Sequence, residues 1–243
     1  MVVFGASAQQ LPWSPTLRYP FTAPTTFIGF DVSLGYASHT ARLPYLDEVY
    51  GIPCCTYESG SGAPIGLSGV IESWIVPTIA VSGSIGLVSE ALTFATLPVT
   101  VPRANKPDLR TQYVLENQQT WAQIAIGTKM RVPASPLTVG VRIAGNVLMG
   151  STMSHKEVVL GPDDYMFLTD PPSKEYVLPD VTFTDVSGFV VRPSIAVTYD
   201  VPLAYGYYIA PSLRLETTMS SLSRQHAWNS TTISVGVTLF KGL

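Results

Sequence analysis

Three of the Val-Pro pairs in the chain each lie between two stretches in which apolar residues alternate with small or polar ones. The pairs are Val76-Pro77, Val132-Pro133 and Val201-Pro202. Because few residues separate the alternating stretches there, each pair predicts a short turn between two antiparallel strands. The other connections are long, polar and rich in Pro and Gly. Short turns that alternate with long loops are typical of an up-and-down β-barrel that spans a membrane.

Eight stretches alternate with a period of two, which places every second side chain on the same face of a strand. Each is close to the ~9–11 residues that a tilted strand needs to cross a bilayer. An even number of strands brings both ends of the chain to the short-turn side. The stretches are 26–37, 65–75, 79–87, 121–132, 137–149, 189–199, 205–216 and 228–240.

The second face of these strands consists mostly of Gly, Ala, Ser and Thr, with about one charged residue per strand. Charged residues are only 13% of the chain, whereas soluble domains have about 25%. A β-sandwich would need a charged, solvated outer face, but a narrow barrel needs small residues inside. We predict an all-β fold, an eight-stranded antiparallel up-and-down transmembrane β-barrel with short periplasmic turns and long extracellular loops. A secreted soluble β-sandwich is the alternative.

The uncharged segment 73–89 is nearly long enough for a membrane helix, but Pro77, Gly83 and Gly86 favour two strands instead. Residues 1–8 end in Ala-Ser-Ala, which fits signal-peptide cleavage after Ala8, although a basic region is missing. We therefore interpret 1–8 as the remnant of a longer signal peptide, with a chance match as the alternative. We expect 9–25 to be an N-terminal periplasmic segment, 26–240 the barrel, and 241–243 a C-terminal tail or the start of a linker.

The most motif-like stretch is the last strand, which reads Thr-Ile-Ser-Val-Gly-Val-Thr-Leu-Phe over residues 232–240. It resembles the aromatic-ended signal that barrel-assembly machinery reads, except that Lys241-Gly242-Leu243 follow Phe240. In its organisation, the chain resembles the small eight-stranded bacterial outer-membrane barrels, the class of the transmembrane domain of outer membrane protein A and of outer membrane protein X.

The resemblance implies a location in the bacterial outer membrane, among its lipids and lipopolysaccharide, and contact with the barrel-assembly machinery during insertion. Barrels of this class can precede a peptidoglycan-binding domain, so a peptidoglycan-linked or extracellular partner is a further expectation.

Ionisable residues occur on the face that we predict to be the barrel interior. Their charges are nearly balanced, and an unpaired charge in a narrow barrel would cost several kcal/mol. We therefore expect a connected polar network that plugs the lumen, since an eight-stranded barrel has room only for its own side chains or one small ligand. A pore is the alternative. The residues are Asp31, Glu72, Lys129, Arg142, Arg192, Arg214 and Glu216.

Aromatic residues near the predicted strand ends suggest an interfacial girdle. Trp121 and Trp228 mark the loop side, and Tyr199, Tyr205 and Tyr207 mark the third short turn. Buried core aromatics are the alternative.

The adjacent residues Cys54 and Cys55 could form a vicinal disulfide, pair with a partner, or remain thiols.

Functional motifs are scarce. A net charge of −3 without a Lys/Arg-rich run argues against nucleic-acid binding. The histidines, His39, His155 and His226, all fall in predicted loops, and no spacing indicates a catalytic triad or a paired-carboxylate site. We expect no enzyme activity, cofactor or metal, although His39 with Asp47 and a Ser could serve a lipid-modifying enzyme.

The acidic stretch 151–187 could bind Ca²⁺, but it matches no calcium-loop pattern. We predict a structural or scaffold role with surface interactions through the loops. A small transport barrel is the alternative.

Overall fold

The computed structural model describes residues 25–53, 55–133, 135–179, 185–204 and 206–243. Besides the long strands it contains a helix, α1 (Tyr45–Tyr50), and three short strands, β4 (Val99–Val101), β7 (Glu175–Val177) and β9 (Val201–Ala204). Within these ranges no helix is long and apolar enough to cross a membrane. The eight long strands are β1 (Thr26–Leu43), β2 (Tyr57–Val76), β3 (Ile79–Ala95), β5 (Leu109–Arg131), β6 (Leu137–Gly161), β8 (Phe189–Tyr199), β10 (Tyr207–Thr217) and β11 (Trp228–Gly242).

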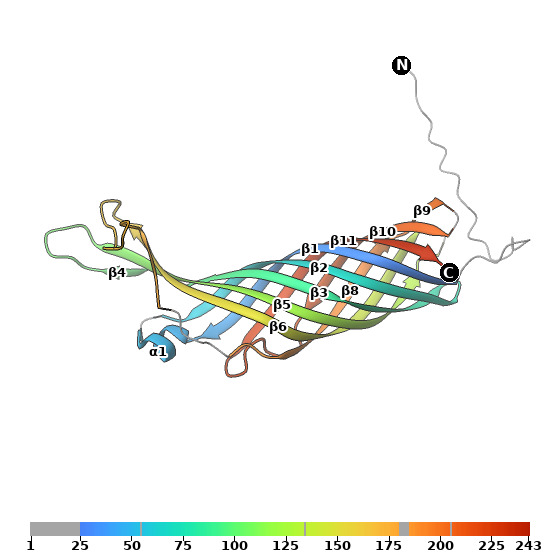
Figure 1. The fold of residues 1–243 in the computed structure, drawn as a ribbon, viewed down its shortest axis with the longest axis horizontal. Helices are drawn as coiled ribbons and strands as arrows, with labels where there is room; N and C mark the ends of the chain where they lie inside the picture. Colours follow the sequence, from blue (N-terminus) through green and yellow to red (C-terminus); the bar gives the residue numbers. More distant parts are fainter. Residues whose placement is uncertain (1–24, 54, 134, 180–184, 205) are drawn as a thin grey trace, which may run out of the picture.

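The long strands pair antiparallel in chain order, and the first also pairs with the last (Figure 1). The β1–β11 register runs from Phe27 opposite Gly242 to Ala41 opposite Trp228, so the ring is closed. Closure removes the free sheet edges, and it confirms the predicted eight-stranded up-and-down barrel. Lys241 and Gly242 also belong to β11, so this strand extends two residues past the predicted end of the barrel at residue 240.

The short connections lie together at the end of the barrel where β1 begins and β11 finishes (Figure 1). β2 and β3 are separated only by Pro77 and Thr78, as predicted. The third Val-Pro pair is displaced, because Val201 and Pro202 lie in β9, opposite Ile209 and Tyr208 of β10. Its turn comes later and includes Gly206, whose φ of 74° is the left-handed conformation that glycine tolerates best.

An apolar band surrounds the outside of the barrel. The outward side chains of β1 from Ile28 to Tyr36 are all apolar and between 42% and 62% exposed. The nine residues from Ile28 to Tyr36 rise about 27 Å along the strand. After tilting, this length is comparable with the ~25 Å apolar band of outer-membrane barrels. The next outward side chains, Ser38, Thr40 and Arg42, are polar and mark the edge of the band. The band crosses a membrane, and a secreted β-sandwich does not fit it.

Strands β5 and β6 are longer than predicted and continue past the band. Their outer parts, 109–119 and 150–161, form a projection with β4 and β7, which we call the arm (Figure 1). At the base of the arm, residues 114–119 still pair with the end of β3. The predicted acidic loop 151–187 therefore begins as a strand. Trp121 pairs with Leu148 and Thr120 with Gly150, so Met149 is an extra residue in β6. This bulge exchanges the inward and outward positions of β6 where the arm begins.

A cap covers the mouth of the barrel at the long-loop end. It consists of α1 and the described residues of 178–188 and 218–227. Its side chains Leu46, Leu178, Val186 and Leu222 are buried in one apolar cluster with barrel residues such as Phe94. The long connections thus fold back onto the barrel because their apolar residues bury surface there.

Candidate functional site

The barrel interior is the candidate site, and its inward side chains form layers. At the short-turn end an aromatic floor consists of Phe27, Tyr208 and Phe240, with Val70 and Trp74 packed against them. The rings of Tyr208 and Phe240 stack with their centroids 4.7 Å apart, and Phe27 meets Tyr208 edge-on at 5.0 Å. These three side chains are at most 5% exposed.

Glu72 connects the floor to the charged interior. Its Oε1 accepts hydrogen bonds from Trp74 Nε1 and from the Tyr208 hydroxyl, both at 2.8 Å. Its Oε2 lies 2.5 Å from Lys129 Nζ. Lys129 reaches across β3, where its opposite residue is the small Ala80. Every carboxylate oxygen of Glu72 thus has a partner.

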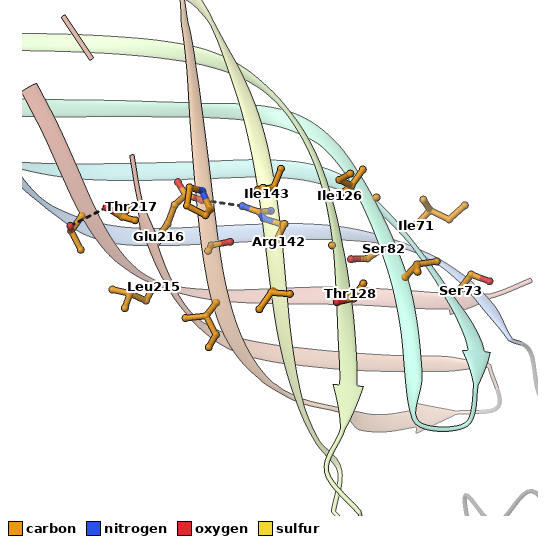
Figure 2. Close-up of a pocket in the computed structure, with 18 residues that line it drawn as sticks. Ile71, Ser73, Ser82, Ile126, Thr128, Arg142, Ile143, Leu215, Glu216 and Thr217 are labelled. Carbon is orange, nitrogen blue, oxygen red and sulfur yellow. Dashed lines mark hydrogen bonds and ion pairs between the residues drawn. The ribbon is translucent and has the colours of Figure 1, made fainter. Parts of the chain in front are cut away.

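Three arginines and two carboxylates occupy the middle of the barrel. Glu216 lies 3.3 Å from Arg142 and 3.5 Å from Arg192. Arg142 and Glu216 flank Ser194 on neighbouring strands, and the small serine side chain leaves room for them to meet. Figure 2 shows the contact between Arg142 and Glu216. The remaining pair is Arg214 with Asp31, at 3.7 Å. Asp31 also accepts a hydrogen bond of 2.7 Å from Thr238.

Above this layer, His39 and Glu90 form a buried pair with Trp228. Trp228 Nε1 donates to His39 Nδ1 at 3.1 Å, and His39 Nε2 lies 2.9 Å from Glu90 Oε1. Because an indole nitrogen only donates, Nδ1 must be the acceptor, and Nε2 carries the proton that it donates to Glu90. Arg192 lies 4.0 Å from Glu90, with its guanidinium 5.6 Å from the centre of the Trp121 ring.

All seven charged residues predicted for the interior lie there, in the ion pairs described above. Two interior residues, Glu90 and His39, were missed because the predicted strands ended too early. Residue parity could have identified both as inward-facing. His39 follows the inward residue Asp31 by an even number of residues, and Glu90 follows the inward residue Ala80 by an even number as well. The prediction that His39 lies in a loop was wrong, because it is 1% exposed within β1.

The predicted girdle needs a correction at its tryptophans. Trp121 and Trp228 are 0% exposed and lie in the apolar cluster inside the barrel. Trp121 is on the same strand face as the inward residue Gln123, and Trp228 is on the same face as the inward residue Thr232. Both tryptophans therefore point into the lumen. Tyr199 and Tyr207 face outward with exposures of 47% and 42%. Tyr205 and Cys54 lie outside the described residues, and the Cys54–Cys55 pairing stays a prediction.

Two small cavities lie inside the barrel around Arg142, with volumes of about 40 and 70 Å³. A much larger hollow of about 1040 Å³ is lined mostly by outward side chains such as Ile71, Ile126 and Ile143, and partly by the inward residues Arg142 and Glu216 (Figure 2). The three isoleucines are at least half exposed. The large hollow therefore belongs to the lipid-facing wall, where acyl chains pack, and the interior has room only for a few bodies the size of water.

The cap is held by Asp185, which is 5% exposed. Its carboxylate accepts hydrogen bonds from the Tyr45 hydroxyl at 2.7 Å, from Ser223, and from the backbone N–H groups of Arg224 and Gln225 at 3.1 and 2.9 Å. One carboxylate thereby joins α1 to the connection between β10 and β11.

Two further histidines lie in or beside the cap. His226 lies 3.0 Å from Glu48 of α1. His155, at the base of the arm, is 5% exposed and contacts the Tyr57 hydroxyl at 3.3 Å. Burial lowers the pKa of His155 to about 4. Among the described residues, no three His, Cys, Asp or Glu side chains come together as a metal site would require.

No protein-family model and no curated protein matches the chain. Among solved structures it is similar to Neisserial surface protein A (NspA), with 9% identity, a TM-score of 0.35, and coverage of 90% of this chain and 99% of that one. It is also similar to the outer membrane protease OmpT of Escherichia coli, with 9% identity, a TM-score of 0.31, and coverage of 93% and 99%. It is similar as well to Ail, the attachment invasion locus protein of Yersinia pestis, with 12% identity, a TM-score of 0.26, and coverage of 88% of this chain and 98% of that one.

Because these similarities are low, the assignment of the chain to a class of barrel depends on the closed ring of strands and on its apolar band. Single-chain barrels of bacterial outer membranes have an even number of antiparallel strands, short turns on one side and long connections on the other. The chain has all three features. It is an eight-stranded up-and-down β-barrel of the outer-membrane class, located in a bacterial outer membrane.

Proposed function

We propose that the protein is a closed scaffold that holds an arm and a cap outside the membrane for surface interactions, rather than a pore or an enzyme. One observation carries the proposal: fully buried inward side chains occur at successive levels of the barrel, from the floor to the mouth. They are at most 5% exposed in the aromatic floor, at Asp31, at Arg192 and at the Trp121–Trp228 level. Ion pairs connect these levels, so a solute would have to break buried charge pairs to pass.

The arm is the part that is suited to contacts. From Gln119 to Leu109, strand β5 rises about 33 Å along its axis at ~3.3 Å per residue. Its outward side chains Glu116 and Gln118 are exposed and polar, which suits water and not lipid. Near the far end, Met166 and Leu168 are 50% and 103% exposed. Large exposed apolar side chains at the end of a projection favour binding to another macromolecule.

Catalysis finds little support in the geometry. Both ring nitrogens of His39 are engaged, with Trp228 and Glu90, and the side chain is enclosed. A lipid-modifying site would need this histidine at the outer surface. We further propose that lipopolysaccharide borders the upper edge of the apolar band and that barrel-assembly machinery inserts the chain. A peptidoglycan-linked partner remains a proposal of the same kind.

Ion conductance in planar lipid bilayers tests the closed scaffold. The full-length chain should insert, as shown by heat-modifiable gel mobility, without producing conductance steps. A conducting outer-membrane porin reconstituted in the same bilayers is the positive control, because it shows that steps would be detected if they occurred. Stable steps of the unaltered protein that scale with salt concentration would favour the pore.

A further inference from the structure

Unpaired hydrogen-bond donors are concentrated in the middle of the barrel. Arg142 Nε, Arg192 Nε and Arg192 Nη2 are buried without a hydrogen-bond partner, and so are the hydroxyls of Ser84 and Ser194. A guanidinium N–H has no way to accept a hydrogen bond, so it needs an acceptor. Leaving such a group unpaired inside a protein costs more free energy than a typical hydrogen bond gains.

The nearby carboxylate oxygens are already in use. The two oxygens of Glu216 serve Arg142 and Arg192, and those of Asp31 serve Arg214 and Thr238. Glu90 Oε2 lacks a hydrogen bond, but the ion pair that it makes, at 4.0 Å, is with Arg192. The protein therefore offers Arg142 Nε no acceptor of its own.

The cavity of about 70 Å³ adjoins these donors. Three cations, Lys129, Arg142 and Arg214, line it with one carboxylate, Asp31. Hydroxyl side chains supply much of the remaining lining, among them Ser84 and Ser194. Ser194 is 8% exposed, so its free hydroxyl is enclosed.

The ion pairs of the two arginines at this cavity are long, whereas Lys129 is held at 2.5 Å by Glu72. Arg142 lies 3.3 Å from Glu216, and Arg214 lies 3.7 Å from Asp31, whereas tight charged hydrogen bonds between nitrogen and oxygen are about 2.7–2.9 Å. In addition, Arg142 shares Glu216 with Arg192. The guanidinium groups thus keep part of their capacity for a further anionic partner.

We propose that the cavity binds one monovalent anion of halide size, such as chloride, between Arg142 and Arg214. Water could accept from Arg142 Nε, but it would bring no negative charge to a low-dielectric site lined by three cations and one carboxylate. The volume suits an ion of this size with a water molecule or two. The hydroxyls of Ser84 and Ser194 complete the set of donors.

Thermal unfolding in detergent tests the site. The full-length chain is compared in sodium chloride and in sodium gluconate of equal ionic strength, since gluconate is too large to enter. Chloride should raise the unfolding temperature saturably, by about 3 °C well above its dissociation constant, and bromide should do the same. Arg142→Gln and Ser194→Ala should each reduce this chloride-dependent difference.

Arg110→Gln is the matched control, because Arg110 is exposed on the arm, and it should keep the full chloride effect. The effect is a difference within each variant, so a general loss of stability cancels. Ser194→Ala preserves the test if Arg142→Gln does not fold. Crystals grown in bromide should show an anomalous peak within hydrogen-bond distance of Arg142 Nε.

Equal unfolding temperatures in the two salts would show a cavity filled with water and overturn the proposal. An equal loss of the chloride effect in Arg110→Gln, or a bromide peak away from Arg142, would do the same.

Discussion

His39 and Glu90 meet at 2.9 Å directly above the position of Gly62 on β2. A Cβ atom at Gly62 would lie 2.7 Å from Glu90 Oε1 and 3.1 Å from His39 Nε2. The missing side chain is therefore a condition for this buried pair. Glycine acts here by leaving space for a polar contact, not by adopting an unusual backbone conformation.

Substituting Gly62→Ala should lower the free energy of unfolding by about 1–3 kcal/mol, because the methyl group displaces one partner and leaves a buried polar group unpaired. Urea unfolding in detergent micelles measures the change. Gly69→Ala is the control, since its Cβ would face outward with Ile85 O, at 4.0 Å, as its nearest neighbour. If both variants lose the same stability, the pair does not depend on space at Gly62.

Glu72→Leu should destabilise the barrel by about 2–4 kcal/mol, because it leaves the Lys129 ammonium without its carboxylate in a largely buried position. Adding Lys129→Met should restore part of that loss. The recovery stays incomplete, since Trp74 and Tyr208 still lack their acceptor. A double-mutant cycle of unfolding free energies gives the coupling between the two residues. Strict additivity would show that the pair contributes nothing as a pair.

Asp185→Ala should loosen the cap and leave the barrel folded. The substitution removes the acceptor of Tyr45, Ser223 and two backbone N–H groups. The connection between α1 and the loop between β10 and β11 is then reduced to apolar packing and the His226–Glu48 contact. Limited proteolysis should then cut within the cap, while heat-modifiable mobility of the barrel persists. Asp163→Ala is the control, because Asp163 pairs with Lys174 in an exposed loop. Unchanged protease resistance of Asp185→Ala would contradict this role.

Alternation by residue parity was sufficient to predict the ring and its charged lumen, because lipid outside and a crowded lumen inside impose opposite demands on the two faces. Arg142 and Val141 show this, since one pairs inside with Glu216 and the other is 58% exposed. The same rule, carried further along the strands, would have placed His39, Trp121 and Trp228 correctly. The error at Trp121 and Trp228 arose because they were assigned to the interfacial girdle on account of their place at the strand ends, although their parity puts them on the inward face.

Contacts between segments distant in sequence could not be predicted. Asp185 and Tyr45 are separated by 140 residues, and neither lies in a repeating pattern. The arm was missed for another reason, because its strands leave the membrane and their outward residues, such as Glu116 and Lys156, become polar. The hydrophobic alternation that identifies a membrane strand ends there, although the hydrogen-bonded ladder continues.

Acidification should weaken the outer part of the molecule through His155. Its folded pKa of about 4 lies below the ordinary value of 6.5, so between these values the unfolded state binds a proton that the folded state does not. Stability attributable to His155 is therefore fully present above about pH 6.5 and falls as the pH drops toward 4, by an amount on the order of 2–3 kcal/mol.

Hydrogen exchange of the cap and the base of the arm, followed as a function of pH, measures this loss, and His155→Gln is the matched variant because it keeps a polar side chain that cannot titrate. The exchange protection of the unaltered protein should fall between pH 6.5 and 4 by more than that of His155→Gln. Other acidic groups titrate in both proteins and cancel in the difference. Parallel pH profiles would mean that His155 is protonated in the folded state as easily as in water, which its 5% exposure among Tyr45, Tyr50 and Tyr57 argues against.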